Sequence, residues 1–384
     1  MIAMFQNAKI LYLAHDSNDS RVLHRARALR TSGVDLIVAA FHRTKIPGRT
    51  GNEWASIDLG RTVDYAYFDR VVRLFLGAVR LWHMRSRIRS IDAVIARNIE
   101  QLLLALWVRQ LSHGPLPIAY ECLDIHRMML GTGVTSRIFR LVERFCLTRT
   151  ELLIVSSPSY IEEYFASRQH FRGRWLLVEN KLPAEFTAIP RSSGAAVQPG
   201  RPTTIGWFGM LRCMKSFDLL LKIADARPDD VRILIRGKPT EVTEDAFRRM
   251  IGDRPNVEYG GVYRNPDDLA ELYSAIDLTW AIDFYQEGDC SEWLLPNRLY
   301  ESCFFTVPLL ARAGTTTAAY TLERKIGWVL VPPLAEHLLV LLDELRGPAY
   351  RTVVTHIAAM PVHNWVDNGE ASDIVGGLIE PPRS

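Results

Sequence analysis

Short apolar runs alternate with segments of helical periodicity along most of this chain, and this alternation constrains its fold more than any other feature. Residues 9–14 and 34–40 are almost entirely apolar. Between them, Val22, Ala26 and Leu29 recur at the spacing of one helix face. A strand, a helix and a second strand in this order favour a parallel sheet, because parallel strands need a crossover connection.

The same alternation continues in two series, which are separated by a stretch rich in Pro, Gly and Ser. Beyond residue 40, the first series is expected to form strands and helices at residues 93–96, 101–111, 117–120, 136–148, 152–156, 160–166 and 175–178. The second series is expected to form them at residues 204–208, 217–226, 231–235, 241–251, 257–259, 266–275, 278–281, 299–303 and 307–311. The chain is therefore predicted to be an α/β protein with two doubly wound, Rossmann-like domains facing a cleft.

The length of 384 residues supports this division, because it exceeds what one hydrophobic core usually fills. We expect a first domain at residues 1–182, a linker at 183–203, a second domain at 204–360 and a C-terminal segment at 361–384. No GxGxxG motif opens the first helix, so the dinucleotide-binding fingerprint is absent.

Composition restricts the compartment and the partners. The five cysteines are scattered without a C-x-x-C pair, which argues against a disulfide framework or a zinc site and favours a reducing cytoplasm. We expect neither a signal peptide nor a membrane-spanning helix, because no run of 18 apolar residues occurs. The first 180 residues hold nine more basic than acidic residues, whereas the rest hold six more acidic than basic ones. A basic first half would attract anionic lipid, phosphate or nucleic acid.

A loop with two cations follows the strand expected at 204–208. Gly209 would let the backbone approach a ligand closely, and Arg212 and Lys215 stand just before an apolar helix. The amino terminus of a helix carries free N–H groups and a positive dipole, so this loop suits a diphosphate. The alternative is a solvated loop with two surface cations.

A second helix start carries another candidate set. Pro296 suits a first helical turn, and Asn297 and Arg298 would then lie near its positive end. Glu301 falls one turn later on the face of Asn297 and could accept hydrogen bonds from both hydroxyls of a ribose. The alternative is an exposed helix start with an ordinary surface glutamate.

Together, the two clusters resemble the nucleotide-binding half of the GT-B-fold glycosyltransferases, especially family 4 and its exopolysaccharide-type members. The family pattern Gly-Arg-Leu, followed by Lys-Gly and an apolar helix, is matched by Gly209, Leu211, Lys215 and Leu220. The family pattern Leu-Pro-Asn-Lys-Leu-Tyr-Glu is matched by residues 295–301. The resemblance covers most of the chain and is most specific in the second half.

The resemblance implies a GT-B architecture, in which the last helix crosses back to pack on the first domain. It also implies that Lys215 holds the diphosphate of a nucleotide-sugar donor and that Glu301 holds its ribose. Asn297 and Arg298 would lie beside the diphosphate and the sugar.

Four positions depart from the family pattern. This chain has Met210, Ser216, Trp293 and Thr306 where the family has an arginine, a glycine, a glutamate and a glycine. Arg212 could supply the charge of the missing arginine. Glu292, Asp289 or Glu287 could stand in for the missing glutamate.

Carboxylates follow the strand expected at 117–120 and are candidates for catalysis. Glu121, Asp124 and His126 stand in a segment that resembles the family's Tyr-Asp/Glu-x-His-Asp, although the family's histidine is Leu123 here. Asp124 could deprotonate the acceptor hydroxyl in an inverting transfer, whereas a retaining transfer needs mainly electrostatic help. A carboxylate that caps the following loop is the alternative.

Further polar residues follow the first strand. Asp16, Asp19 and Arg21 would face the expected cleft and could contact the acceptor, as could His126. No Asp-x-Asp pair occurs, so we expect no metal and no other cofactor, with Arg212 and Lys215 neutralising the leaving diphosphate.

Residues 70–89 alternate arginines with large apolar side chains. Arg73, Arg80, Trp82 and Arg85 belong to a pattern that is broad and apolar on one side of a helix and basic on the other, as in helices that lie on anionic membranes. The alternative is a helix that packs on the core and exposes a basic face. Nucleic acid is not favoured as a partner, because the arginines lie among aliphatic side chains rather than stacking aromatic ones.

These observations predict a glycosyltransferase of the hexosyltransferase type, peripheral on the cytoplasmic face of the plasma membrane. It would move a sugar from a nucleotide-diphosphate-sugar to a saccharide acceptor, carried on polyprenyl diphosphate or otherwise, in cell-surface or exopolysaccharide synthesis. Two alternatives stay open: a nucleotide-sugar epimerase of the same fold, and a non-catalytic scaffold that retains a worn donor site.

Overall fold

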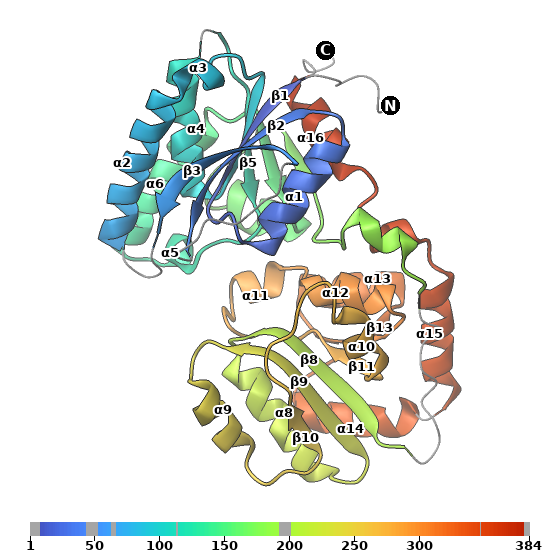
Figure 1. The fold of residues 1–384 in the computed structure, drawn as a ribbon. Helices are drawn as coiled ribbons and strands as arrows, with labels where there is room; N and C mark the ends of the chain where they lie inside the picture. Colours follow the sequence, from blue (N-terminus) through green and yellow to red (C-terminus); the bar gives the residue numbers. More distant parts are fainter. Residues whose placement is uncertain are drawn as a thin grey trace. The chain divides into compact units, whose positions relative to one another are not determined.

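The computed structural model describes residues 8–43, 53–62, 67–112, 114–191, 201–345 and 347–379, with the backbone alone at 67–70. The chain divides into two compact units, shown in Figure 1. Unit 1 combines residues 1–179 with 368–384, and unit 2 comprises residues 180–367. Residues 361–367 therefore belong to unit 2, whereas the sequence analysis grouped them with the C-terminal segment. Of the expected linker, residues 192–200 lie outside the described ranges.

The described part of unit 1 is built on a sheet of seven parallel strands in the order β3-β2-β1-β4-β5-β6-β7. The strands are β1 Lys9–Ala14, β2 Asp35–His42, β3 Ala55–Arg61, β4 Ala93–Arg97, β5 Ile118–Cys122, β6 Leu152–Val155 and β7 Trp175–Leu177. The central strands β4 and β5 are buried along their whole length, which is why they contain mostly apolar residues. β3 was not predicted, because it is an edge strand with only three buried residues.

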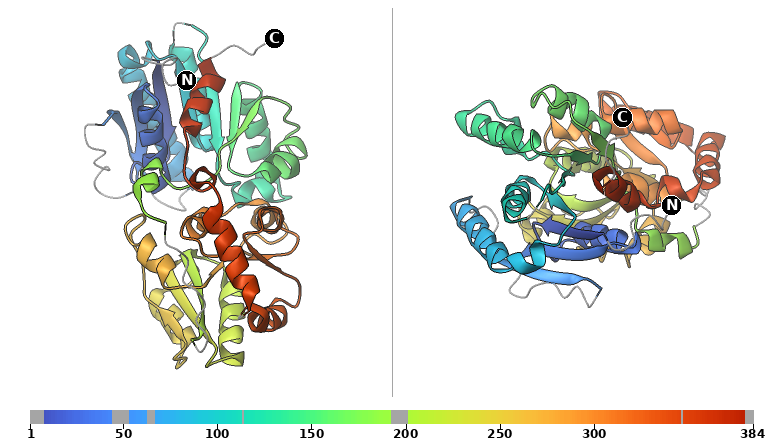
Figure 2. Two further views of the ribbon diagram at one scale, coloured as in Figure 1. Left: turned by 90° about the vertical axis from the view of Figure 1, so that its right-hand side faces the viewer. Right: turned by 90° about the horizontal axis from the view of Figure 1, so that it is seen from above.

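Helices cover both faces of this sheet. They are α1 Ser20–Thr31, α2 Tyr67–His83, α3 Arg85–Ile88, α4 Ile99–Leu111, α5 Arg127–Leu130, α6 Val134–Leu147, α7 Pro158–Tyr160 with a π-helical turn Ile161–Ala166, and α16 Glu370–Ile379. α2, α4 and α6 lie on one face, and α1 and α16 lie on the other (Figures 1 and 2). Ile374, Val375 and Leu378 of α16 belong to the same core cluster as α1, so the last helix completes unit 1.

The expected basic helix at residues 70–89 is interrupted at Met84, between α2 and α3. Gly77 lies within α2, where glycine lowers helix stability. A Cβ at this position would lie 2.9 Å from the ring of Phe41 in β2. Glycine therefore allows α2 to approach the sheet closely.

The described residues of unit 2 form a sheet of six parallel strands in the order β10-β9-β8-β11-β12-β13. They are β8 Thr203–Leu211, β9 Val231–Pro239, β10 Val257–Tyr259, β11 Leu278–Trp280, β12 Leu309–Arg312 and β13 Gly327–Leu330. Its helices are α8 Met214–Ala226, α9 Glu244–Ile251, α10 Leu269–Ser274, α11 Cys290–Trp293, α12 Asn297–Phe304, α13 Thr316–Arg324, α14 Leu334–Leu345 and α15 Pro348–Ala359.

Two core clusters lie on opposite faces of the second sheet. Trp207 packs in the cluster that holds α8 and α14, whereas its neighbour Phe208 packs in the cluster that holds α10 and α12. Successive side chains of a strand point to opposite faces, so one apolar run supplies both cores. The predicted α/β class with two Rossmann-like units is confirmed.

Candidate functional site

Each sheet has a topological switch point, where the strand order turns. β1 lies between β2 and β4 in unit 1, and β8 lies between β9 and β11 in unit 2. In open α/β sheets, ligands bind at the carboxyl ends of the strands at this point. The residues that follow β1, β4, β8 and β11 are therefore the first place to look for a site in each unit.

In unit 2, β8 continues to Leu211, so Gly209 lies within a strand and not in the loop that the sequence analysis expected. Gly209 has φ of +113° and pairs with Gly237 of β9, which has φ of +145°. A Cβ at Gly237 would lie 1.8 Å from the carbonyl oxygen of Gly209. A Cβ at Gly209, by contrast, would meet nothing within 4 Å among the described residues. Glycine at position 237 lets β9 approach β8 closely, and glycine at position 209 leaves open space near the end of β8.

Three cations gather beyond this strand end, each beside a carboxylate. Arg212 lies 3.7 Å from Asp283, Lys215 lies 2.8 Å from Glu287, and Arg312 lies 3.2 Å from Glu292. Lys215 and Arg312 also lie over the ring of Phe284, at 4.4 and 4.7 Å from its centroid.

The sequence analysis missed Arg312. It ends β12, so the rule that residues at the carboxyl end of a parallel strand reach the ligand edge could have found it. Of the expected substitutes for the family glutamate, Glu287 and Glu292 contact these cations, whereas Trp293 itself is buried.

Glu301 is a buried carboxylate in α12, only 5% exposed. Tyr273 donates a hydrogen bond to Oε2 at 2.9 Å, and Asn265 donates to Oε1 at 3.2 Å. Burial and the nearby Glu301 carboxylate raise the pKa of Tyr273 well above its ordinary value, so its hydroxyl remains a donor. The alternative of an ordinary surface glutamate is wrong. Each carboxylate oxygen has a second lone pair and can accept another hydrogen bond.

The neighbouring residues of α12 differ in exposure. Asn297 is exposed at the first turn. Arg298 is partly buried, and its Nη1 donates to the carbonyl of Trp280 at the end of β11, at 3.1 Å. Arg298 thus ties the start of α12 to the switch-point strand.

Two departures from the family pattern are accommodated by packing. The hydroxyl of Ser216 is fully buried and donates to the carbonyl of Ile282 at 3.1 Å. Thr306 has φ of +60°, in the region that favours glycine. The family's glycine at this position is therefore explained by the backbone, and threonine occupies it under strain.

In unit 1, Glu121 does not reach a substrate surface. Its side chain is completely buried, with Oε1 accepting from Arg25 Nε at 2.8 Å and Oε2 accepting from the Tyr12 hydroxyl at 2.9 Å. Arg97 lies 3.7 Å from Oε2. Burial alone would raise the pKa of Glu121, but Arg25 and Arg97 outweigh it and lower the pKa, so the carboxylate stays ionised. The expectation that Glu121 takes part in catalysis directly is therefore corrected: its side chain is closed off from solvent among Tyr12, Arg25 and Arg97.

Asp19 caps the helix α1 that follows β1. Its Oδ1 accepts hydrogen bonds from the backbone N–H groups of Arg21 at 2.9 Å and Val22 at 3.0 Å. Burial would raise the pKa of Asp19, but His15 and Arg97 outweigh it and lower the pKa. Asp19 is therefore held as an anion at the carboxyl end of β1, and the side chain of Arg21 is partly buried beside it.

Asp124 and His126 are exposed in the loop after β5. His126 caps the short helix α5, with Nδ1 accepting from the backbone N–H of Met128 at 3.3 Å. Exposure leaves Asp124 accessible to solvent, as a group that contacts an acceptor must be.

The basic residues of α2 and α3 have different environments. Arg85 lies over the ring of Trp82 at 4.6 Å, and Trp82 is exposed. Arg73 is partly buried. Arg80 packs over Gly60 of β3, where an added Cβ would lie 2.0 Å from its Nη1, so part of its role is to hold the edge strand.

Within the described residues, no cluster of three or more His, Cys, Asp or Glu could hold a metal ion. In the same residues, no helix is both long and apolar enough to span a membrane.

Comparisons with known proteins agree with this fold. No protein-family model matches the chain. The chain is 37% identical over 361 residues to the succinoglycan biosynthesis protein ExoL of Rhizobium meliloti (strain 1021), covering 93% of this chain and 90% of that protein. Among solved structures, it is similar to a sucrose-phosphate synthase of Thermosynechococcus elongatus, with a TM-score of 0.74, 15% identity and coverage of 97% and 98%. It is also similar to Anabaena HepE in complex with UDP, with a TM-score of 0.71, 13% identity and coverage of 96% and 99%.

The fold and these similarities show the GT-B architecture that the resemblance in the sequence implied. The chain belongs to the family of the succinoglycan biosynthesis protein ExoL.

Proposed function

We propose that the protein transfers a sugar from a nucleotide-diphosphate-sugar, bound by unit 2, to a saccharide acceptor in exopolysaccharide synthesis. The observation that carries the proposal is the set of Arg212, Lys215 and Arg312 beyond β8 and β12, with the buried Glu301 on α12. The solved relative HepE, which is similar in fold, was crystallised with UDP, and ExoL acts in succinoglycan biosynthesis.

The charges suit this chemistry. A leaving diphosphate gains negative charge as the glycosidic bond breaks, and fixed cations stabilise that charge without reorganising. In this structure the three cations face Asp283, Glu287 and Glu292. We propose that the donor diphosphate takes the place of these carboxylates as their partner, and that Glu301 accepts the ribose hydroxyls with its remaining lone pairs.

On the acceptor side, we propose Asp124 as the group that accepts the proton of the attacking hydroxyl if the transfer inverts. Its exposure after β5 supports this role. Glu121 acts as a positioning residue: it holds Arg97, and Arg97 also contacts Asp19.

The donor proposal is tested by nucleotide binding. UDP, GDP and ADP are screened by thermal shift with the full chain, because a bound ligand raises the unfolding temperature. Lys215→Ala should weaken binding of the preferred nucleotide at least tenfold, and Glu301→Gln should weaken it as well. Lys222→Ala is the matched control: Lys222 also lies on α8, is similarly exposed and pairs with Glu336 at 2.7 Å. Equal binding by Lys215→Ala and Lys222→Ala would refute the diphosphate role.

The same samples distinguish the transferase from the two alternatives, an epimerase and a non-catalytic scaffold. An epimerase of this fold would isomerise the nucleotide-sugar without any acceptor, whereas a transferase would need one. A scaffold with a worn donor site would bind no nucleotide in the wild-type form. The similarity to ExoL favours the transferase over both.

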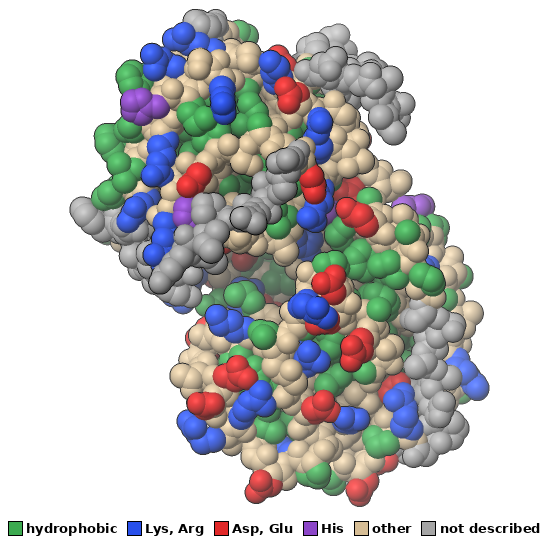
Figure 3. All heavy atoms as spheres, in the orientation of Figure 1, with side chains coloured by type: hydrophobic (Ala, Val, Ile, Leu, Met, Phe, Trp, Pro, Cys, Tyr) green, Lys and Arg blue, Asp and Glu red, His purple; other side chains and the backbone are tan. Residues whose placement is uncertain are grey.

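We further propose that unit 1 rests on an anionic membrane, which would bring it to a lipid-linked acceptor. α2 exposes Val71, Phe75, Val79 and Trp82 among its arginines, along an edge of unit 1 where Figure 3 shows green and blue side chains interleaved. Such a mixture of exposed apolar and basic side chains is typical of helices at a membrane surface.

A second helix supports this proposal. α6 exposes an apolar stripe at helical spacing, which consists of Val134, Ile138, Leu141 and Phe145. α2 and α6 both pack against α4 on the same face of the sheet. Arg149 lies over the ring of Phe145 at 3.7 Å, as Arg85 lies over Trp82. Both helices therefore present an aromatic ring with an arginine, which suits the interface between lipid and water.

Sedimentation with vesicles tests the proposal that unit 1 rests on an anionic membrane. The wild type should sediment with vesicles of phosphatidylcholine and 30% phosphatidylglycerol, and Arg85→Glu/Arg87→Glu should not. The control is Arg248→Glu/Arg249→Glu on α9 of unit 2, which changes the net charge equally at exposed positions. Equal loss in both double variants would show a general charge effect and no membrane-binding surface on α2 and α3.

A further inference from the structure

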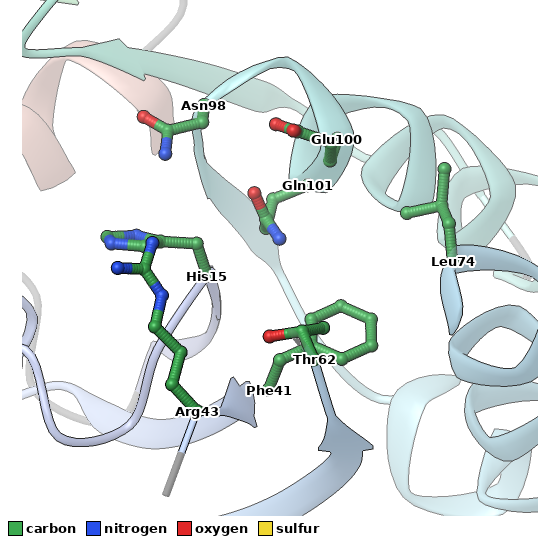
Figure 4. Close-up of a pocket in the computed structure, with 8 residues that line it drawn as sticks. All are labelled: His15, Phe41, Arg43, Thr62, Leu74, Asn98, Glu100 and Gln101. Carbon is green, nitrogen blue, oxygen red and sulfur yellow. The ribbon is translucent and has the colours of Figure 1, made fainter. Parts of the chain in front are cut away.

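Unit 1 holds a pocket at its own switch point, where β1 and β4 lie side by side. Figure 4 shows that His15 reaches it from the end of β1 and that Asn98 and Gln101 reach it from the start of α4. Phe41 and Leu74 supply apolar wall from β2 and α2. The cavity measures about 70 Å³, which is several times the space that one water molecule needs.

Two buried polar atoms in this wall have no hydrogen-bond partner within the described residues. One is Oε1 of Gln101, whose side chain is only 2% exposed, and the other is Nδ1 of His15. The opposite ring nitrogen of His15 faces the Asp19 carboxylate at 3.6 Å. An amide oxygen can only accept hydrogen bonds, so Gln101 Oε1 calls for a ligand that donates one.

The backbone at Asn98 also indicates a ligand site. Asn98 is the N-cap of α4 with φ of +73°, yet its side chain makes no capping hydrogen bond, although asparagine is among the best capping residues. Figure 4 shows its amide directed towards His15. Strained backbone of this kind is concentrated at ligand sites. The amide that would cap α4 is thus turned to the pocket.

We propose that this pocket binds the hydroxyl groups of a sugar residue of the acceptor. A sugar hydroxyl can donate to Gln101 Oε1 and can accept from the amide of Asn98. A fully ionised phosphate has no proton to donate and would leave Gln101 Oε1 unpaired. The inference rests on the proposed transferase function and deepens it, because it names the residues that read the acceptor.

Saturation-transfer NMR on the full chain tests the pocket, with methyl β-D-glucopyranoside, methyl β-D-galactopyranoside and inorganic pyrophosphate as probes. We expect ring-proton signals from at least one glycoside, and no displacement of it by pyrophosphate. Gln101→Leu removes the acceptor and should weaken glycoside binding at least tenfold. Asn98→Gly should weaken it too and should fold, because glycine accepts the positive φ.

His170→Gly is the matched control. His170 also has a positive φ, of +56°, but is exposed in unit 1 and does not line the pocket. Glycoside binding by Gln101→Leu and Asn98→Gly equal to that of His170→Gly would overturn the proposal, and so would absence of binding or displacement by pyrophosphate. Nucleotide binding is measured on the same samples: nucleotide without glycoside binding refutes the pocket alone, whereas loss of nucleotide binding in the wild type refutes the donor site.

Discussion

Two buried glutamates of unit 1 allow one substitution to be compared in two electrostatic settings. Glu121 is fully buried and ionised between Arg25 and Arg97. Glu143 of α6 is also buried, but it accepts hydrogen bonds from Tyr120 and Tyr164. Burial raises the pKa of Glu143, so folding shifts this group towards its neutral form, opposite to the shift of Glu121.

Glu121→Gln should therefore be far more damaging than Glu143→Gln. Removing one partner of a buried ion pair leaves uncompensated charge and costs about 3–5 kcal/mol. For a unit of this size, that lowers the unfolding temperature by about 6–20 °C. Glu143→Gln removes no partner of a buried ion pair and should change the unfolding temperature by less than about 4 °C.

The pH dependence gives a second check. The folded pKa of Glu121 is lowered, so its stabilisation is present above the unfolded pKa, about 4.3, and is lost as pH falls through the folded value. The folded pKa of Glu143 is raised, so the wild type loses stability as pH rises above about 4.3 and Glu143→Gln does not. Calorimetry at pH 4 and pH 7 measures the unfolding temperature of the wild type and of both variants. Equal shifts for the two variants, or shifts that do not vary with pH, would refute this assignment of charges.

Three further results are expected. Gly237→Ala should destabilise unit 2 and weaken nucleotide binding, because its Cβ would collide with the carbonyl of Gly209; unchanged melting would contradict the strand pairing. Thr306→Gly should be tolerated, because relief of about 1–2 kcal/mol of backbone strain opposes the loss of a buried side chain. Thr306→Val keeps the strain and should not raise the unfolding temperature. A large fall in the unfolding temperature with glycine alone would contradict the strain. All five cysteines are buried and free, so a thiol reagent should react with none of them quickly in the native protein and with five after denaturation; fast native reaction would show an accessible thiol.

The sequence by itself determined the fold class and the donor half of the candidate site. Apolar runs and helical periodicity are properties of short windows, so they predicted most strands and the helices between them. Arg212, Lys215 and Glu301 could be named because they stand near a strand end or a helix start, and because Lys215 and Glu301 also match the pattern of the family that the sequence resembles. The edge strands β3 and β13 were not predicted, because their few buried residues leave no such pattern.

Only the tertiary structure decided which distant side chains meet. β1 and β4 are neighbours although more than 75 residues separate them, and that pairing brings His15 to Asn98 and Gln101. Packing between distant elements also turns Glu121 inward, because Tyr12 of β1 and Arg25 of α1 both contact its carboxylate. The physical reason is that strand order and burial depend on packing between remote segments, which no local pattern of residues records.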